Sequence, residues 1–354
     1  MELFDSLTDF INGTPSFQPG RVDMFEIMNA YTKAWGIIHG HQSANADGTK
    51  EYFARYKKIM VSISGGADSD VMLDMIERIG YPKSEVVYVF YNTGLEFEAT
   101  KRHLSFLEDK YGIIIKREKA NVPVPAGVKR YGVPFLSKRV SEYIGRLQKH
   151  GFKFEDRPFE ELLAEYPKSK AALRWWCNNF GEGSQMNIER NRWLKEFLIE
   201  NPPDFRISAG CCEGAKKLTA HRIEREINPD LSVVGIRRYE GGMRSAAYTS
   251  CFSSIESGCD MFRPLFWLKN EDKATYEKEF GVTHSDCYCV YGLKRTGCSC
   301  CPFGKRFDDE LAAAKQYEPN LYLAAINVFG KAYDYTRQYR AFAKRKDQEA
   351  KADG

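Results

Sequence analysis

The stretch IMVSISGGADSDVMLDMIE, residues 59–77, decides the fold of this chain. It begins with a short apolar run that contains β-branched residues and breaks at SGGADS, residues 64–69. Apolar residues then resume at helical spacing (Val71, Met72, Met75, Ile76). This order predicts a strand, a tight loop and a helix. We call residues 64–69 the glycine loop.

The glycine loop has the chemistry of an anion site. Gly65 and Gly66 let the backbone approach an anion closely, and the N–H groups that begin the next helix point toward it. Ser64 and Ser69 add hydroxyl donors, and Asp68 could hold a magnesium ion that bridges two phosphates. The spacing matches neither G-x-x-x-x-G-K-[ST] nor G-x-G-x-x-G, so an ordinary glycine-rich turn is the alternative.

The composition is that of a folded protein without a membrane span. Of 354 residues, 43% are hydrophobic and 28% charged, and the net charge of +4 is too small to indicate nucleic acid or membrane binding by itself. No apolar run approaches the ~18 residues of a membrane span, and the start, MELFDSLTDF, lacks a signal-peptide pattern. We therefore expect a cytoplasmic protein without membrane contact.

Strand and helix patterns alternate along the chain. An amphipathic helix over residues 22–38 precedes the glycine loop, and strands are predicted at 85–90 and 113–117, with a helix between them. Alternation predicts an α/β fold with a parallel sheet, helices on both faces, and ligands at the carboxyl ends of the strands. We expect four parts: a helical leader (1–56), a nucleotide-binding α/β domain (57–280), a cysteine-rich metal-binding segment (281–306) and a helical tail (307–354).

Three weaker patterns complete this prediction. Residues 121–138 contain several prolines and glycines and read as a turn-rich excursion. Residues 205–209 are predicted to form a strand that leads into Cys211. The last ten residues, RKDQEAKADG, are expected to be disordered.

The glycine loop resembles the S-G-G-x-D-S loop of the PP-loop ATP pyrophosphatases and of their relatives, the phosphoadenylyl-sulfate reductases. Residues 90–113, FYNTGLEFEATKRHLSFLEDKYGI, resemble the F-x-D-T-G-x-E-F-x-E-T segment of the reductase family. Thr93 and Glu96 match, whereas Asn92 stands where the family usually has Asp, and Ala99 also departs. Many relatives place Lys at the position of Ala67, so a cationic contact to phosphate must come from elsewhere in this chain or is not needed.

Further motifs follow in the family's order. RWWCN, from Arg174, resembles the family's R-W-C-T, and GIRR, from Gly235, with Arg244 resembles G-[IL]-R-x-x-x-S-x-x-R. Pro264, Leu265 and Trp267 match P-L-x-x-W. The resemblance implies catalytic roles for Asp68, Ser69 and Cys177. It implies nucleotide binding by Ser62, Ser64, Gly65, Gly66, Ala67, Asp68, Ser69, Asn92, Thr93, Gly94, Glu96, Arg174, Gly235, Arg237, Arg238 and Arg244.

The ten cysteines point to metal or redox chemistry, because thiols of a cytoplasmic protein are normally reduced. Cys211 and Cys212 are adjacent, and Cys298 and Cys301 form a C-x-x-C pair. Four thiolates bind zinc or an iron–sulfur cluster. Zinc on Cys287, Cys289, Cys298 and Cys301 is one alternative, but it leaves Cys211 and Cys212 without a role.

The pattern of Cys211, Cys212, Cys298 and Cys301 resembles the four-iron four-sulfur (4Fe-4S) site of assimilatory adenylyl-sulfate reductases. Their C-C-x-x-R-K is matched by CCEGAKK, residues 211–217, with one extra residue. The resemblance implies an iron–sulfur cofactor on these four cysteines.

The resemblance implies an enzyme that binds an adenine nucleotide. No cysteine follows Cys301 and no E-C-G-L-H segment is present, so the leading hypothesis is adenylation with ATP and Mg²⁺. Sulfur would then pass through Cys177 or the cluster, supplied by a cysteine desulfurase, to an acceptor such as tRNA or DNA. One alternative is a sulfonucleotide reductase that uses Cys177 or a thioredoxin-like thiol donor. Another is a non-enzymatic nucleotide- or nucleic-acid-binding module with structural zinc.

Overall fold

The computed structural model describes residues 25–39, 42–44, 50–52, 56–80, 83–240, 247–254 and 258–352. The chain forms two compact units, which are described separately. Unit 1 consists of residues 1–91, 98–118 and 220–297, and unit 2 of residues 92–97, 119–219 and 298–354. This division does not follow the boundaries expected at residues 57, 281 and 307, because unit 2 takes up segments from three of the four expected parts. Most of the expected leader and Arg244 lie outside the described residues.

Unit 1 is built on a six-stranded sheet of order β5-β4-β3-β6-β8-β7. The central strand β3 pairs in parallel with β4 and β6, β6 pairs in parallel with β8, and β7 is antiparallel to β8. The strands are β3 (Ile59–Ile63), β4 (Val86–Asn92), β5 (Ile115–Lys119), β6 (Leu231–Val234), β7 (Phe252–Ser253) and β8 (Asp260–Phe262). The predicted α/β class with a mostly parallel sheet is confirmed.

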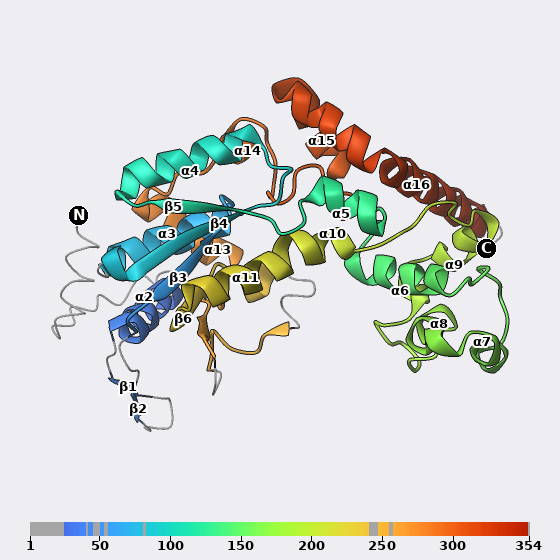
Figure 1. Ribbon diagram of the computed structural model, residues 1–354, viewed down its shortest axis with the longest axis horizontal. Coiled ribbons are helices and arrows are strands. Elements are labelled where there is room, and N and C mark those ends of the chain that lie inside the picture. Colours follow the sequence, from blue (N-terminus) through green and yellow to red (C-terminus); the bar gives the residue numbers. More distant parts are fainter. Residues whose placement is uncertain are drawn as a thin grey trace. The chain divides into compact units, whose positions relative to one another are not determined.

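Helices cover both faces of this sheet because successive residues of a strand point to opposite faces. Ile59, Val61 and Ile63 of β3 pack into a large core with residues of α2, α3, α4 and α13. Met60 of the same strand packs instead against α11, through Ile223 and other residues. Figure 1 shows α3 and α4 beside the strands of this unit. The helices are α2 (Phe25–His39), α3 (Ala67–Ile79), α4 (Glu98–Tyr111), α11 (Leu218–Ile227), α13 (Asn270–Phe280) and α14 (Asp286–Cys289).

Unit 1 also has short elements outside the six-stranded sheet. Strands β1 (Gln42–Ala44) and β2 (Lys50–Tyr52) pair antiparallel as a separate ribbon. Short 3₁₀ turns lie at Lys83–Glu85 and Arg238–Glu240.

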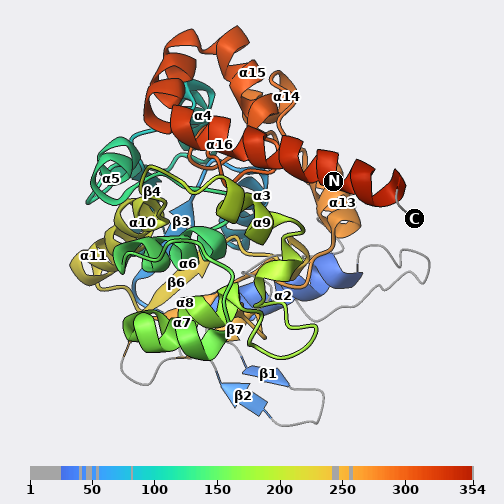
Figure 2. The same cartoon turned by 90° about the vertical axis from the view of Figure 1, so that its right-hand side faces the viewer.

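Unit 2 is helical, and Figures 1 and 2 both show α16 as one long continuous helix. Its core is rich in aromatic residues, including Phe135, Trp175, Trp176, Tyr335 and Phe342. The α-helices are α5 (Val124–Tyr131), α6 (Lys138–Lys149), α7 (Phe159–Glu165), α8 (Lys170–Trp176), α9 (Leu194–Glu200), α10 (Gly210–Cys212), α15 (Phe307–Tyr317) and α16 (Pro319–Ala352). A π-helical turn, Glu213–Lys217, follows α10, and 3₁₀ turns lie at Pro167–Ser169 and Ile188–Arg190.

Three predictions about unit 2 are wrong. The expected turn-rich excursion contains α5, because Pro123 is its N-cap and Pro125 falls in its first turn, where proline is compatible with a helix. The expected strand at 205–209 is reduced to a bridge between Ile207 and Val133. The expected disordered end is helical through Ala352 in the residues that the structure describes.

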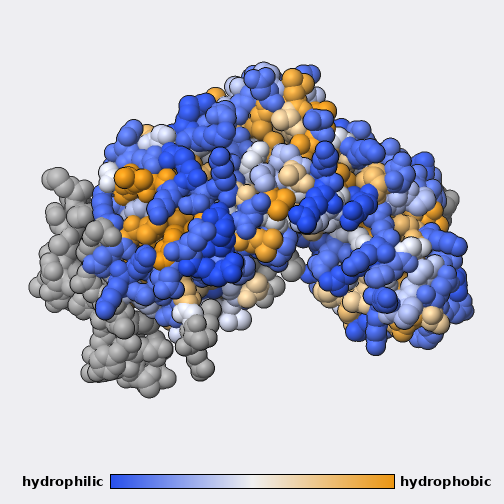
Figure 3. Space-filling view, in the orientation of Figure 1, coloured by the Kyte–Doolittle hydropathy of each residue, from blue (hydrophilic) through white to orange (hydrophobic). Residues whose placement is uncertain are grey.

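The visible surface is mostly hydrophilic, with apolar patches that are limited in extent (Figure 3). Within the described part of the chain, no helix has the length and apolarity that crossing a membrane requires.

Candidate functional site

The glycine loop joins β3 to α3 in the conformation that the sequence predicts. Gly65 has a φ of 66°, and a Cβ at this position would lie 2.8 Å from Thr100 Cγ2, so a larger residue would not fit. Ser69 Oγ accepts a hydrogen bond from the Ser64 N–H at 2.9 Å. Gly66 is the N-cap of α3 and offers no side-chain oxygen to the first N–H groups of the helix. The Ala67 N–H donates to the Tyr288 hydroxyl at 3.1 Å, and the N–H groups that follow it in the first turn are suited to an anion from outside the helix.

Three of the predicted binding residues come together at the start of α3. Arg237 Nε lies 3.0 Å from Asp68 Oδ2. Gly235 passes so close to the helix that a Cβ there would lie 3.2 Å from the Asp68 carbonyl oxygen and 3.4 Å from Ser69 Cα. Glycine at 235 is thus what lets the end of β6 lie against the glycine loop and place Arg237 beside Asp68.

Asp68 and Arg237 belong to a larger set of charges in unit 1. Lys273 Nζ lies 3.5 Å from Asp68 Oδ1 and 2.6 Å from Glu277 Oε1. His284 lies between Glu277 and Asp70, with 2.8 Å from its ring nitrogens to each carboxylate. We call Asp68, Asp70, Arg237, Lys273, Glu277 and His284 the charge network.

The charge network contains three carboxylates and, when His284 is protonated, three cations, and His103 Nε2 also lies 3.1 Å from Asp70 Oδ2. Burial disfavours the charge of His284, but hydrogen bonds to Asp70 and Glu277 outweigh it and raise its pKa to about 9. Glu277 shows the reverse direction, since hydrogen bonds from His284 and Lys273 outweigh burial and lower its pKa. The network therefore adds no net positive charge, and a polyphosphate bound nearby needs further counter-charge.

Sequence reasoning missed four members of the charge network as site residues: Asp70, Lys273, Glu277 and His284. Lys273 and Glu277 are four residues apart on α13, a spacing at which opposite charges pair on a helix. That spacing was the signal in the sequence that could have identified Lys273 and Glu277 as a charged pair. Lys273 also supplies the cation near the loop that Ala67 lacks.

The second predicted nucleotide loop, residues 92–96, belongs to unit 2. Asn92 Oδ1 accepts from the Gly94 N–H at 2.9 Å, which closes a tight turn. The buried Glu96 carboxylate accepts from both the N–H and the hydroxyl of Thr93. Thr93 also hydrogen-bonds the thiol of Cys298. This loop is therefore part of the surroundings of the cysteines.

Unit 2 also gathers the four predicted metal-binding cysteines, which we call the thiol cluster: Cys211, Cys212, Cys298 and Cys301. A hydrogen bond from Cys211 and the nearby ammonium groups of Lys138 and Lys216 lower the pKa of Cys212 to about 6, although burial opposes this. The Cys211 pKa is raised, first by its hydrogen bond to Cys212, then by burial and by the charges of Cys212, Cys301 and Cys298.

The pKa values of the other two thiols of the cluster are both raised. Burial, and then the charges of Cys298 and Cys212, raise the pKa of Cys301 to about 12. Burial is also the main cause that raises the pKa of Cys298, while Lys216 opposes it. The charges of neighbouring thiols thus contribute to the raised pKa values of Cys211, Cys298 and Cys301, whereas the pKa of Cys212 is lowered.

The thiol cluster is held by close helix packing in unit 2. A Cβ at Gly127 of α5 would lie 3.0 Å from Cys211 Cα, and one at Gly214 would lie 2.8 Å from Val122 Cβ. Lys216 faces the thiols, because the charges of Cys298 and Glu96 raise its pKa despite burial. No three His, Cys, Asp or Glu side chains among the described residues are arranged to hold a metal ion. The donor set has the right chemistry, but the metal site stays a prediction.

Cys177 and Arg174 lie in the helical body of unit 2. Cys177 packs with the aromatic core, and burial raises the pKa of its thiol. Trp175 and Trp176 are fully buried in that core and do not line a surface site. Arg174 donates to the Asn179 carbonyl oxygen and lies over the Phe180 ring.

The remaining predicted site residues lie in varied surroundings. Ser62 hydrogen-bonds Tyr91 in the sheet, and the Arg238 guanidinium lies over the Trp267 ring. Cys287 is buried and its sulfur lies 3.6 Å from Thr100 Oγ1, whereas Cys289 is exposed. Both belong to unit 1, while the C-x-x-C pair belongs to unit 2.

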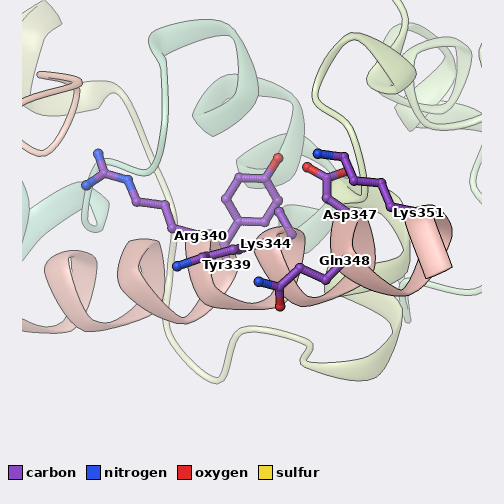
Figure 4. A pocket seen from close by; sticks show the side chains of 7 residues that line it. Tyr339, Arg340, Lys344, Asp347, Gln348 and Lys351 are labelled. Carbon is purple, nitrogen blue, oxygen red and sulfur yellow. The ribbon is translucent and has the colours of Figure 1, made fainter.

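A surface hollow lies on the last turns of α16. Figure 4 shows its side chains, and every residue that lines it comes from this one helix: Tyr339, Arg340, Ala343, Lys344, Asp347, Gln348 and Lys351. None of the predicted site residues is among them. The hollow therefore gives no support to a nucleotide site.

Comparison with known proteins gives one family match and one curated relative. Residues 58–150 match the model of the phosphoadenosine phosphosulfate reductase domain. An uncharacterised protein of Methanocaldococcus jannaschii is 27% identical over 200 residues, which is 54% of this chain. The match spans 39% of that relative's length.

Three solved structures show distant likeness. A phosphoadenylyl-sulfate reductase from Candida auris, in complex with phosphate, has a TM-score of 0.37 and 15% identity, covering 68% of this chain and 81% of its own. A Candida glabrata FMN adenylyltransferase has a TM-score of 0.38 and 10% identity, covering 84% of this chain and 69% of its own. A U34-tRNA thiolase from Methanococcus maripaludis with its [4Fe-4S] cluster has a TM-score of 0.35 and 14% identity, covering 90% of this chain and 80% of its own.

The family match begins one residue before β3 and covers the whole glycine loop, α3 and the second predicted loop. It therefore falls on the strand, loop and helix whose geometry suits an anion. Residues 58–150 of this chain are thus similar to the phosphoadenosine phosphosulfate reductase domain.

Proposed function

We propose that the glycine loop binds the pyrophosphate of ATP and that the protein transfers an adenylyl group in the course of a sulfur-transfer reaction. The observation that carries this is the convergence of Asp68, Gly235 and Arg237 at the start of α3. The dipole of α3 and the guanidinium of Arg237 favour a bound oxyanion. Because the charge network is balanced, the nucleotide must bring Mg²⁺ with it.

Asp68 is the residue suited to that magnesium ion. Magnesium prefers carboxylate oxygens. Oδ2 of Asp68 is held by Arg237 at 3.0 Å, whereas Oδ1 has Lys273 at 3.5 Å and is the less tightly held oxygen. In the proposed reaction an oxygen of the acceptor attacks the α-phosphorus and the bond to the leaving pyrophosphate breaks. Arg237 and Lys273 stabilise the negative charge that develops on the leaving group.

The thiol cluster supports the proposed iron–sulfur cofactor. Cys211, Cys212, Cys298 and Cys301 would hold it, and Lys216 would place a positive charge beside it. When bound, a 4Fe-4S cluster supplies sulfide and redox chemistry. Lys138 and Lys216 already favour the thiolate of Cys212, the form in which cysteine binds a metal. Sulfur would come from a desulfurase and go to an acceptor such as tRNA or DNA.

Pyrophosphate release tests the proposed adenylation. We expect the anaerobically purified protein, with ATP, Mg²⁺ and candidate acceptors, to release pyrophosphate, and Asp68→Ala to abolish this release. Asp260→Ala is the matched control, because Asp260 bonds Tyr56 and belongs to no part of the charge network. Absence of nucleotide binding by the unaltered protein would refute the proposal.

Absorption spectroscopy tests the cofactor. We expect the anaerobic protein to show a broad band near 400 nm, roughly as iron–sulfur proteins do, and Cys298→Ser to lose it. Cys177→Ser should keep the band. A colourless protein that contains zinc would overturn the iron–sulfur assignment and favour the structural-zinc alternative.

A sulfonucleotide reductase is the second candidate, and the match to the reductase domain favours it. In that reaction a thiolate attacks the sulfur of adenylyl sulfate and the nucleotide leaves. The thiol would come from a thioredoxin-like partner. Release of sulfite from adenylyl sulfate in the presence of thioredoxin, without pyrophosphate release from ATP, would select this candidate.

A further inference from the structure

Two hydroxyl groups from a distant part of the chain lie against the glycine loop. The Tyr288 hydroxyl accepts a hydrogen bond from the Ala67 N–H at 3.1 Å, and it lies 3.1 Å from Thr296 Oγ1. A Cβ at Gly66 would lie 3.0 Å from Thr296 Oγ1 and 3.3 Å from the hydroxyl oxygens of Tyr288 and Ser64. Three hydroxyl groups therefore surround the glycine at the start of α3.

We infer that Tyr288 and Thr296 are oxyanion-binding residues that form a second wall of the site at the glycine loop. This inference rests on the proposed function and extends it to residues that no motif marks. The ligand group is a tetrahedral oxyanion, either a phosphate of pyrophosphate or the sulfate end of a phosphosulfate. Within the protein the Gly66 N–H donates to Ser64 Oγ and the Ala67 N–H donates to the Tyr288 hydroxyl, so a ligand oxygen would compete with these hydroxyls for the N–H groups and accept from the hydroxyls in turn.

The position of Tyr288 is fixed by the packing of α14 within unit 1. Asp286 pairs with Arg102 of α4 at 3.1 Å, and the Cys287 sulfur lies 3.6 Å from Thr100 Oγ1. Just before α14, His284 is held by Asp70 of α3 at 2.8 Å. These contacts tie the residues just before Tyr288 to the helices beside the loop, so the Tyr288 hydroxyl is preorganised and loses little freedom when a ligand binds.

The chemistry of these hydroxyls suits an oxyanion. Burial raises the pKa of the Tyr288 phenol, so it stays protonated and able to donate. Its oxygen accepts from Ala67, which leaves its own proton for Thr296 or for a ligand oxygen. The Thr296 hydroxyl can likewise donate its proton to Tyr288 or to a ligand oxygen. Neutral donors bind a phosphate or sulfate oxygen without adding charge to the balanced charge network, so they raise affinity without attracting anions indiscriminately.

Calorimetric titration of the full chain with Mg²⁺–pyrophosphate, Mg²⁺–ATP and adenylyl sulfate tests this inference. Tyr288→Phe and Thr296→Val each remove one hydroxyl and keep the shape of the side chain. We expect each to raise the Kd of the ligand that the unaltered protein binds by roughly ten- to hundredfold, the usual effect of a lost hydrogen bond to a charged group. Thr296→Ser keeps the hydroxyl and should bind within about threefold of the unaltered protein.

Tyr56→Phe is the matched control, because its hydroxyl bonds Asp260 and lies outside the glycine loop. It should leave every Kd unchanged. If the unaltered protein binds a ligand and Tyr288→Phe and Thr296→Val bind it equally well or more tightly, the inference is wrong while the proposed function stands. If the unaltered protein binds none of the three ligands, both fail. The ligand that is bound distinguishes pyrophosphate from phosphosulfate as the source of the oxyanion.

Discussion

Arg237 Nε lies 3.0 Å from Asp68 Oδ2. Its Nη1 donates to Asn270 Oδ1 at 3.1 Å and to the Leu268 carbonyl oxygen at 3.4 Å. One planar guanidinium thus orients the first carboxylate of α3 from a fixed position. Lysine keeps the charge but cannot reach three acceptors at once. We expect Arg237→Lys to weaken Mg²⁺–ATP binding by roughly tenfold, or about 1.4 kcal/mol, in calorimetric titration.

Arg117→Lys is the control for this substitution. Arg117 also pairs with a carboxylate, donating to both oxygens of Glu108, but on the surface of unit 1. The Arg117→Lys variant should bind Mg²⁺–ATP with the same affinity as the unaltered protein. Equal affinity of Arg237→Lys and Arg117→Lys would show that the guanidinium of Arg237 has no part in binding.

Gly66→Ala tests the close packing over the glycine loop. The new methyl group would meet the hydroxyl oxygens of Thr296, Ser64 and Tyr288 at 3.0–3.3 Å, so at least one of them must move. We expect nucleotide binding to weaken at least roughly tenfold, with a loss of stability of about 1 kcal/mol that urea unfolding can measure.

Gly36→Ala provides the comparison, because Gly36 lies inside α2 and a Cβ there would meet nothing within 4 Å. This change should stabilise the protein by roughly 0.5–1 kcal/mol and leave binding intact. If both variants bind alike, the glycine loop does not need its glycine at 66.

Gly127→Ala tests the packing that places the thiol cluster. Its Cβ would lie 3.0 Å from Cys211 Cα, a backbone atom that cannot turn away. Helix α5 must then shift from α10, and Cys211 with it. We expect the iron and acid-labile sulfide content of the anaerobic protein to fall at least roughly twofold. Gly330→Ala in α16, where the space is open, should keep the full content; equal loss in both would point to a general effect of the substitution.

His284 gives the protein a pH-dependent contribution to stability. Its pKa is raised from 6.5 to about 9 in the folded protein, so folding favours the protonated form. The stabilisation is complete below pH 6.5 and is lost as the pH rises through 9. By linkage it amounts to roughly 2–4 kcal/mol.

Urea unfolding between pH 6 and pH 10 checks this expectation. His284→Gln should be less stable than the unaltered protein at pH 6, and the difference should shrink by pH 10. His221→Gln is the control, since the His221 side chain is 70% exposed beside Glu224. A difference that stays constant across this range would show that His284 acts through packing and not through its charge.

Local pattern was sufficient for the core of unit 1. The apolar run of β3, the glycines after it and the helical spacing of α3 are all encoded within about twenty consecutive residues. Arg237 could be placed near the loop only through its motif. Lys273 and His284 could not be placed, because their contacts to Asp68 and Asp70 join residues about 200 positions apart, and no local periodicity records such a pairing.

In unit 2 the errors came from residues whose meaning depends on tertiary context. Pro123 and Pro125 read as loop residues, yet they begin α5. Trp175 and Trp176 stood beside a motif cysteine, yet they fill a core that α16 also lines. The grouping of Cys211 and Cys212 with Cys298 and Cys301 was predicted by resemblance, and their mutual effects on pKa agree with it, whereas their role as ligands stays a prediction.

The π-helical turn at Glu213–Lys217 explains how this chain accommodates one residue more than the C-C-x-x-R-K pattern. A π turn contains one residue more than an α turn and lets the helix on either side keep its original phase. The extra residue is therefore looped into the backbone here, and Lys216 still faces Cys298. An insertion that would rotate the rest of an ordinary helix by about 100° is absorbed within a single turn. The π turn thus keeps Lys216 toward the thiols although the spacing differs by one residue from the pattern that this segment resembles.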